Sequence, residues 1–280
     1  MSIKTKKLVK KILFYVFICI FFFILVIFPF YWMLKTAFEA RENLFRYPPT
    51  FFPQVLDLSG FIGVFTEKPI FLWLKNSLLV SVSVVLISML FSTLSAYSLS
   101  RYKNRINSSV GFIVLITQML PGTLFVLPIF ISFSQYGLVN TFTGAIVAFT
   151  TFSLPICIWM LKGYFDSAPI EIEQAAFIDG CTKMGALFRV VIPLALPGYV
   201  STAIFAFIVG WNEYMFAFVL LAPKSKWLLA NGLASFIGEF TAPWNWVMAA
   251  AIIYTIPAVL LFVFLQRYLV QGLTAGAVKG

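Results

Sequence analysis

The sequence contains no histidine, ten acidic residues and three cysteines. Without histidine, the chain can form neither a Ser-His-Asp triad nor a histidine metal site. The cysteines Cys19, Cys157 and Cys181 have no CxxC spacing, so we interpret them as three small apolar side chains. The phosphate-binding pattern G-x-x-x-x-G-K-[ST] is also absent. We therefore expect no catalytic residue, no metal site and no cofactor bound by this chain.

Charged residues make up 11% of the chain and hydrophobic residues 61%, whereas soluble domains carry about 25% charged residues. The apolar residues gather in runs of about 20 residues, the length that crosses about 30 Å of hydrocarbon. These runs predict an all-α membrane protein with six transmembrane helices, at roughly 12–34, 71–97, 109–134, 140–162, 198–222 and 247–269. The first run is too long for a signal-peptide core and lacks a small-residue cleavage site, so we expect a retained span.

The net charge of +10 is distributed unevenly between the segments that connect these spans. Most Lys and Arg residues lie before the first span, in 98–108, in 162–197 and after the last span. Because basic loops stay on the cytoplasmic side, we expect both termini in the cytoplasm and the chain in the cytoplasmic (inner) membrane. The organisation is then a basic tail (1–11), a transmembrane domain (12–270) and a C-terminal tail (271–280). The basic residues form no soluble module, which favours membrane lipid and not nucleic acid as their partner.

The longest expected cytoplasmic loop, 163–197, has the pattern of two short helices. Ser167 or Ala168 is expected to cap the first helix, with Pro169 in its first turn. Gly180 is expected to end it in a left-handed conformation. Such a loop is too structured to be a simple linker.

The two helices also predict faces that a partner could contact. Thr182 is expected to cap the second helix, which runs to Pro193. One expected face of this helix is apolar and consists of Met184, Leu187, Phe188 and Val191. A stripe with little side-chain bulk on the first helix consists of Ile172, Ala176 and Gly180. The alternative is an amphipathic element that lies on the membrane or packs under the bundle.

The segment E-Q-A-A-F-I-D-G-C at 173–181, followed by Phe188 and I-P-L-A-L-P at 192–197, resembles the EAA loop of ABC importer permeases. In that family the loop forms a coupling helix that docks into a cleft on the ATPase subunit. The resemblance implies that the ATPase-coupling residues are Glu173, Gln174, Ala175, Ala176, Asp179 and Gly180. Gln174 stands where Glu is usual and Cys181 where Ala is usual, so the resemblance implies docking by shape more than by charge.

Further motifs resemble the carbohydrate-transporting subclass, most of all the smaller six-span permease of maltose-type importers. They are F-P-F-Y-W-M-L-K at 28–35, N-S-L-L-V at 76–80, A-Y-S-L-S-R at 96–101, Q-M-L-P at 118–121, W-N-E at 211–213 and Q-R-Y-L-V-Q-G-L-T-A-G-A-V-K-G at 266–280. The resemblance implies a sugar-importing type I ABC permease. The implied partners are a second permease subunit in a heterodimer, two ATPase subunits that hold ATP and Mg, and an extracytoplasmic sugar-binding protein.

Polar residues in or near the spans are the remaining site candidates. A carboxylate inside a span is costly, so Glu213, with Asn212 and Asn76, is a candidate for the translocation pathway. The alternative for Glu213 is a structural ion pair or hydrogen bond between helices. By resemblance, the loop 223–246 contacts the binding protein, with Asn231 and Gly232 as the candidate residues.

Other function classes fit the sequence less well. A permease for a non-sugar polar solute, such as glycerol phosphate, remains an alternative cargo. An ion-coupled secondary transporter would need carboxylates near the membrane midplane, but Glu213 is the one acidic residue within an expected span. A membrane-embedded lipid or glycosyl transferase would need clustered catalytic groups that the sequence lacks.

Overall fold

The computed structural model describes residues 3–238 and 242–277, and these residues form helices joined by loops, with no strand among them. An all-helical fold agrees with the prediction, since a helix satisfies its own backbone hydrogen bonds in hydrocarbon. The contacts divide the chain into two compact units. The first unit contains residues 1–69 and 235–255, and the second contains 70–234 and 256–280.

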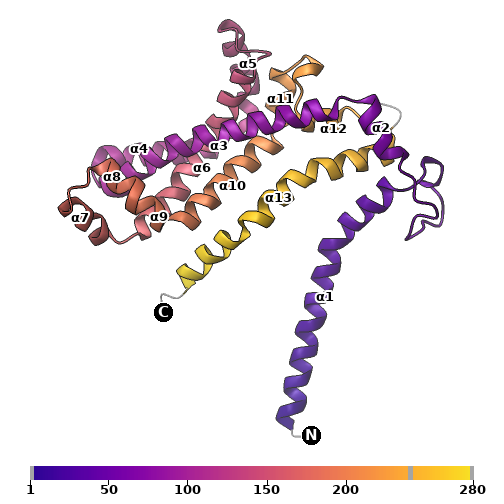
Figure 1. Ribbon diagram of the computed structural model, residues 1–280, viewed down its shortest axis with the longest axis horizontal. Helices are drawn as coiled ribbons and strands as arrows, with labels where there is room; N and C mark the ends of the chain where they lie inside the picture. Colours follow the sequence, from indigo (N-terminus) through magenta and orange to yellow (C-terminus); the bar gives the residue numbers. More distant parts are fainter. Residues whose placement is uncertain (1–2, 239–241, 278–280) are drawn as a thin grey trace. The chain divides into compact units, whose positions relative to one another are not determined.

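The first unit begins with the long helix α1 (Ile3–Ala37), which includes the basic residues expected to form a separate tail. It continues through η1 (Arg41–Asn43) and α2 (Ser59–Glu67) and includes the start of α13 (Trp244–Ala277) (Figure 1). The side chains along Lys11–Ala37 are largely exposed, as expected for a helix that faces lipid. Near its end, Lys35 and Glu39 form a buried ion pair with a Nζ–Oε2 distance of 2.6 Å.

Helix α2 packs closely against the start of α13 through two glycines. A Cβ atom on Gly60 would lie 2.9 Å from the carbonyl oxygen of Ala37 and 3.0 Å from that of Asn245. A Cβ atom on Gly63 would overlap the Trp246 indole at 2.2 Å. Larger side chains would therefore separate these helices, which explains why glycines occupy both positions.

The second unit has a core of three helices, α3 (Ile70–Arg101), α6 (Phe142–Ser167) and α10 (Leu196–Asn212) (Figure 1). Small and hydroxyl side chains allow these helices to approach each other. The hydroxyl oxygens of Ser88 and Ser153 lie 2.6 Å apart between α3 and α6. A Cβ atom on Gly210 of α10 would lie 3.1 Å from the Cα atom of Ser81 on α3. The spans predicted near 71–97 and 140–162 correspond to α3 and α6; α3 extends beyond both predicted ends, whereas α6 begins at Phe142 and extends to Ser167.

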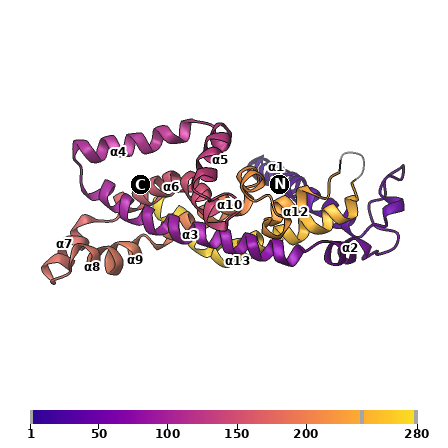
Figure 2. The same ribbon diagram turned by 90° about the horizontal axis from the view of Figure 1, so that it is seen from above.

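The segment predicted as one span at 109–134 is instead sharply bent. It contains α4 (Arg105–Ile116), the short 3-10 helices η2 (Thr117–Met119) and η3 (Gly122–Phe125), and α5 (Val126–Gln135). The two halves meet at 91°, a corner that is visible in Figure 2. Leu120 adopts extended backbone angles because it precedes Pro121, which disfavours the helical conformation. The proline was identified in the sequence, but a bend of this size was not predicted.

The segment predicted as one span at 198–222 is also discontinuous. Helix α10 ends at Asn212, Glu213 is extended, and α11 (Met215–Leu220) follows. At the other end, α10 meets the preceding helical segment Lys183–Leu194 at 87°. The break at Glu213 and the turn before Leu196 were not predicted, because local hydropathy does not report where the chain changes direction.

The remaining elements of the second unit lie at its ends. They are α7 (Ile170–Ile178), α8 (Lys183–Ala186), the π-helical turn η4 (Leu187–Val191), α9 (Ile192–Leu194), η5 (Lys224–Lys226) and α12 (Leu229–Ala234). Across the described residues, four unbroken helices are long and apolar enough to span a membrane, and each bent pair adds one span to give up to six. This agrees with the predicted six-span architecture.

Candidate functional site

The segment singled out by sequence forms a helical hairpin beyond the end of α3, built from α7 and the helical run that begins with α8 (Figures 1 and 2). Gly180 ends α7 with a φ of +87°, and the N–H of Cys181 donates to the Ala176 carbonyl at 2.9 Å. Thr182 caps α8 by accepting the N–H of Gly185 at 3.1 Å. The predicted stop at Gly180 and cap at Thr182 are both confirmed.

The start of α7 differs from the prediction. Pro169 occupies the N-cap position, with no side-chain hydrogen bond, and α7 begins at Ile170. Ser167 is the last residue of α6, and its hydroxyl donates to the Tyr164 carbonyl at 2.7 Å. Ser167 therefore closes the preceding helix instead of capping the next one, because α6 extends further than hydropathy indicated.

Glu173 is the residue that holds α7 against the bundle. Its side chain is 4% exposed, although glutamate is rarely buried without a partner. The carboxylate accepts the hydroxyl of Tyr97 and the Nε–H of Arg101, the latter at 2.6 Å. Both partners lie on the last turns of α3. A buried ion pair offsets the cost of its desolvation only when its members are well placed and hydrogen-bonded. Tyr97, Arg101 and Glu173 meet this condition and form one hydrogen-bonded group.

The polar network continues from Arg101 into α6. One Nη of Arg101 donates to the Phe165 carbonyl and to the Ser100 hydroxyl, each at 2.9 Å. Ser100 in turn donates to Asp166 at 2.6 Å. Asp166 also pairs with Lys162 at 2.5 Å. We call this set the anchor network, and its members are Tyr97, Ser100, Arg101, Lys162, Asp166 and Glu173. It fastens α7 to the ends of both α3 and α6.

The other residues predicted for coupling divide between the two sides of α7. Gln174, Ala175, Asp179 and Gly180 are exposed, whereas Ala176 is buried next to Glu173. The predicted stripe of Ile172, Ala176 and Gly180 is therefore not one exposed face, because α7 uses Ala176 to pack on the bundle. Glu173 is buried in this structure, so its side chain cannot contact an ATPase directly here. It instead attaches α7 to α3 from the inside.

The apolar face predicted for the second helix is also divided. Leu187 and Val191 are buried in a cluster with Tyr97, Leu161 and Phe165. Met184 and Phe188 are exposed, as is Ile178 at 87%. The four residues thus form two pairs with a spacing of four, one buried and one exposed, and Leu187–Val191 forms a π-helical turn. Lys183 completes the attachment by donating to the Tyr102 hydroxyl at 2.8 Å.

Asn76, a candidate for the pathway, is instead buried in the packing of a loop. Its amide donates to the carbonyls of Ser225 and Trp227 at 3.1 and 3.0 Å. The neighbouring Trp73 donates to the Lys224 carbonyl at 2.9 Å. Asn76 thus holds the 224–227 loop on the start of α3, and its role in the pathway stays a prediction. An asparagine satisfying loop carbonyls cannot be distinguished by sequence from one that faces a solute.

Glu213 lies at the break between α10 and α11. Its carboxylate accepts the N–H of Phe216 at 3.0 Å, the bond expected of a residue that caps a helix. The side chain is partly exposed, and that of the adjacent Asn212 is exposed. Both remain candidates for the pathway, and the capping role of Glu213 was not predicted.

The candidates for binding-protein contact, Asn231 and Gly232, are buried in α12. A Cβ atom on Gly232 would lie 2.0 Å from the Trp73 ring, so this glycine permits the close approach of α12 to α3. The N–H of Leu229 donates to the Ser77 hydroxyl at 2.7 Å and fixes the same contact. Both residues contribute to the packing of α12 on α3 in this structure, and their contact with a binding protein stays a prediction.

The fold and site together define a multispanning helical membrane protein with a structured polar hairpin at one end. Residues 88–275 match the family described as binding-protein-dependent transport system inner membrane component. The chain belongs to this family of transport permeases.

Several members and a solved structure are similar over most of the chain. The sulfoquinovosyl glycerol transport system permease protein SmoH of Agrobacterium fabrum is 34% identical, covering 91% of this chain and 89% of SmoH. The diacetylchitobiose uptake system permease protein DasC of Streptomyces coelicolor is 35% identical, covering 92% of this chain and 94% of DasC. A bacterial ABC transporter involved in the import of the acidic polysaccharide alginate has the same fold, with a TM-score of 0.82 at 23% identity, covering 96% of this chain and 98% of that chain.

Proposed function

We propose that this chain is the permease subunit of an ATP-driven ABC importer that translocates a sugar delivered by an extracytoplasmic binding protein. Membership in a family named for binding-protein-dependent transport supports the delivery route. The relatives SmoH and DasC and the alginate transporter are named for cargoes that contain sugar units, which supports a carbohydrate. A non-sugar polar solute such as glycerol phosphate is the alternative cargo.

The observation that carries this proposal is the two-sided construction of α7. Its inner side is fixed to α3 by Glu173, while its outer side leaves Gln174 and Asp179 exposed next to Ile178. Ile170, Ile172 and Phe177 of α7 are exposed as well, and a group of exposed apolar side chains bordered by polar residues is typical of a docking surface. The proposed occupant is an ATPase subunit, with two such subunits holding ATP and Mg and a second permease forming a heterodimer with this chain. This chain itself is non-catalytic.

The mechanism proposed is alternating access with both termini and the α7–α8 hairpin in the cytoplasm. Closure of the ATPase dimer on ATP moves the docked hairpin, and the anchor network transmits this displacement to α3 and α6. The two permeases then open outward while the binding protein releases its sugar between them. ATP hydrolysis returns the bundle to the inward-facing state.

The test is co-purification followed by reconstitution. The permease should retain an ATPase and a second permease, and sugar with its binding protein should stimulate ATP hydrolysis in proteoliposomes. Glycerol phosphate with its own binding protein serves as the comparison cargo. Solute uptake that follows an ion gradient and needs no ATPase subunit would contradict the proposal.

A further inference from the structure

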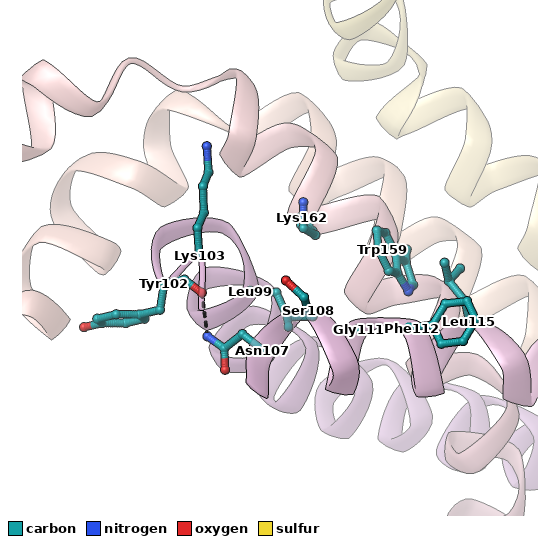
Figure 3. A pocket seen from close by; sticks show the side chains of 10 residues that line it. All are labelled: Leu99, Tyr102, Lys103, Asn107, Ser108, Gly111, Phe112, Leu115, Trp159 and Lys162. Carbon is teal, nitrogen blue, oxygen red and sulfur yellow. Dashed lines mark hydrogen bonds between the residues drawn. The ribbon is translucent and has the colours of Figure 1, made fainter. Parts of the chain in front are cut away.

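A cavity of about 490 Å³ lies in the second unit between α4 and the ends of α3 and α6, but the groups that line it are divided. Figure 3 shows Lys103 at one end, whereas Trp159 lies beside Phe112 and Leu115 at the other. One small ligand would therefore not contact both the cation and the indole. The first unit has a more coherent surface, on the loop that follows α1.

This loop, residues 45–56, exposes large apolar side chains and carries little charge, and we call it the aromatic loop. Its exposed apolar residues range from 66% exposure at Phe51 to 92% at Tyr47, and they are Phe45, Tyr47, Phe51, Phe52, Val55 and Leu56. Arg46 is the one charged residue in this range, and its Nη1 donates to Oε1 of Gln54 at 2.9 Å. Such a dense group of exposed apolar side chains marks a surface that contacts a protein or a membrane.

The contacts of the aromatic loop define its level along α1. Figure 1 shows the loop turning back beside the end of this helix. The Tyr31 hydroxyl donates to the Phe51 carbonyl, and the ring centroids of Tyr31 and Phe52 lie 6.1 Å apart. The ring centroids of Trp32 and Phe51 lie 6.4 Å apart. Tyr31 precedes the end of α1 at Ala37 by about 9 Å, at about 1.5 Å per residue, so the loop reaches back along the span.

The uncharged run of α1 places this level at the edge of the hydrocarbon. No charged residue occurs in 12–34, between Lys11 and Lys35. Tyr31 lies about 30 Å along the helix from Lys11, at about 1.5 Å per residue, and the hydrocarbon core is about 30 Å thick. With Lys11 at one boundary, Tyr31 lies at the other, where tyrosine and tryptophan are enriched. The charge of Lys35 is compensated there by Glu39, at 2.6 Å.

We propose that the aromatic loop inserts into the headgroup region of the membrane leaflet that surrounds this end of α1. Phe51, Phe52 and Val55 lie at the boundary with the acyl chains, and the Arg46 side chain extends toward the lipid phosphates. A bilayer is the partner that the geometry favours, because a protein that docks from outside gives no reason for the loop to fold back to the level of the span. The inserted loop restrains the depth of α1 in the membrane. The proposal does not depend on which solute the permease transports.

The test is electron paramagnetic resonance of the whole assembly in lipid bilayers, with one nitroxide label on a chain without its native cysteines. Labels at Phe52→Cys and Val55→Cys should collide more often with oxygen, which concentrates in hydrocarbon, than with a water-soluble nickel chelate. Glu42→Cys, at an exposed position just before the loop, is the matched control and should favour the nickel chelate. Val55 takes no part in the ring contacts with α1, so its label keeps the test decisive if Phe52→Cys perturbs the loop.

The measurement is made with and without the binding protein, and three results would overturn the proposal. Equal nickel access at positions 42, 52 and 55 would place the loop in water. Shielding of positions 52 and 55 from both reagents, lost when the binding protein is removed, would assign the loop to that protein. Shielding from both reagents in either condition would mean that another subunit covers it.

Discussion

Glu173 shows how one buried charge can position a docking element. Removal of its carboxylate would leave the Arg101 guanidinium buried without its main partner. Breaking a buried ion pair in this way costs about 3–5 kcal/mol, enough to release α7 from α3. The exposed residues Gln174 and Asp179 can act on a partner only while this attachment holds.

Glu173→Ala is therefore expected to give an inserted permease with weak ATPase retention or uncoupled hydrolysis. The measurement is ATPase co-purification together with sugar-stimulated ATP hydrolysis in proteoliposomes. Glu171→Ala is the matched control, because it removes an exposed carboxylate from the same helix. If both variants behave like the wild type, the anchor network does not contribute to coupling.

Gly180 is the second residue on which the proposed coupling depends. Its φ of +87° is unfavourable for L side chains, and a Cβ atom there would meet nothing within 4 Å. Gly180→Val should therefore strain the turn by about 1–2 kcal/mol without a clash inside the chain, and should obstruct an approaching partner. Loss of ATPase binding or coupling, in a stably inserted protein, is the expected result. The control is Gln174→Glu, which restores the residue usual in the family and should be tolerated. Normal coupling in the Gly180→Val protein would remove the main support for this hairpin as the coupling element.

Glu213 caps α11 and is proposed to line the solute pathway, and two substitutions separate these roles. Glu213→Gln keeps an oxygen that can accept the Phe216 N–H, whereas Glu213→Ala removes it and should cost about 1 kcal/mol of local stability. If the charge lines the pathway, both variants should lower sugar uptake while the complex stays assembled. Normal uptake by Glu213→Gln would show that capping is its whole contribution, and failed assembly of both would show a structural role.

At the scale of elements, close helix contacts depend on single glycines. Helix α12 can lie on α3 because Gly232 leaves room for the Trp73 ring. Gly232→Leu should therefore lower stability by about 1–3 kcal/mol, the usual effect of overpacking. Thermal unfolding of the purified assembly measures this. Gly163→Leu, at a position in α6 where a Cβ atom has no neighbour within 4 Å, is the control and should unfold near the wild-type temperature.

At the scale of the whole molecule, the charge distribution predicts which loops share a side of the membrane. In a background without the native cysteines, Lys183→Cys should react with a thiol reagent only from the cytoplasmic side. Lys224→Cys should react from outside, since an odd number of expected spans separates the two positions. Labelling of position 183 from outside intact cells would contradict both the topology and the proposed ATPase contact.

The sequence by itself determined the class of protein, the helical content and the position of the hairpin. These follow from local properties: apolar run length, basic loops, and the turn chemistry of Gly180 and Thr182. Which side chains of the hairpin face outward was decided by the tertiary structure alone. Glu173 and Gln174 are adjacent acidic and amide residues, yet α7 buries the first because Tyr97 and Arg101 lie within reach, more than seventy positions earlier in the chain.

The same reason explains why the packing of Asn76 and Gly232 was not predicted. Asn76 was a pathway candidate as a polar residue in an expected span, and Gly232 a binding-protein contact by resemblance. Their neighbours, the carbonyls of Ser225 and Trp227 and the ring of Trp73, come from distant segments that hydropathy cannot bring together. Pro121 explains why Leu120 is extended, but the 91° angle between the two halves was not predicted from the sequence. Local sequence fixes which segments are helices, whereas packing between distant segments decides which residues are free to act.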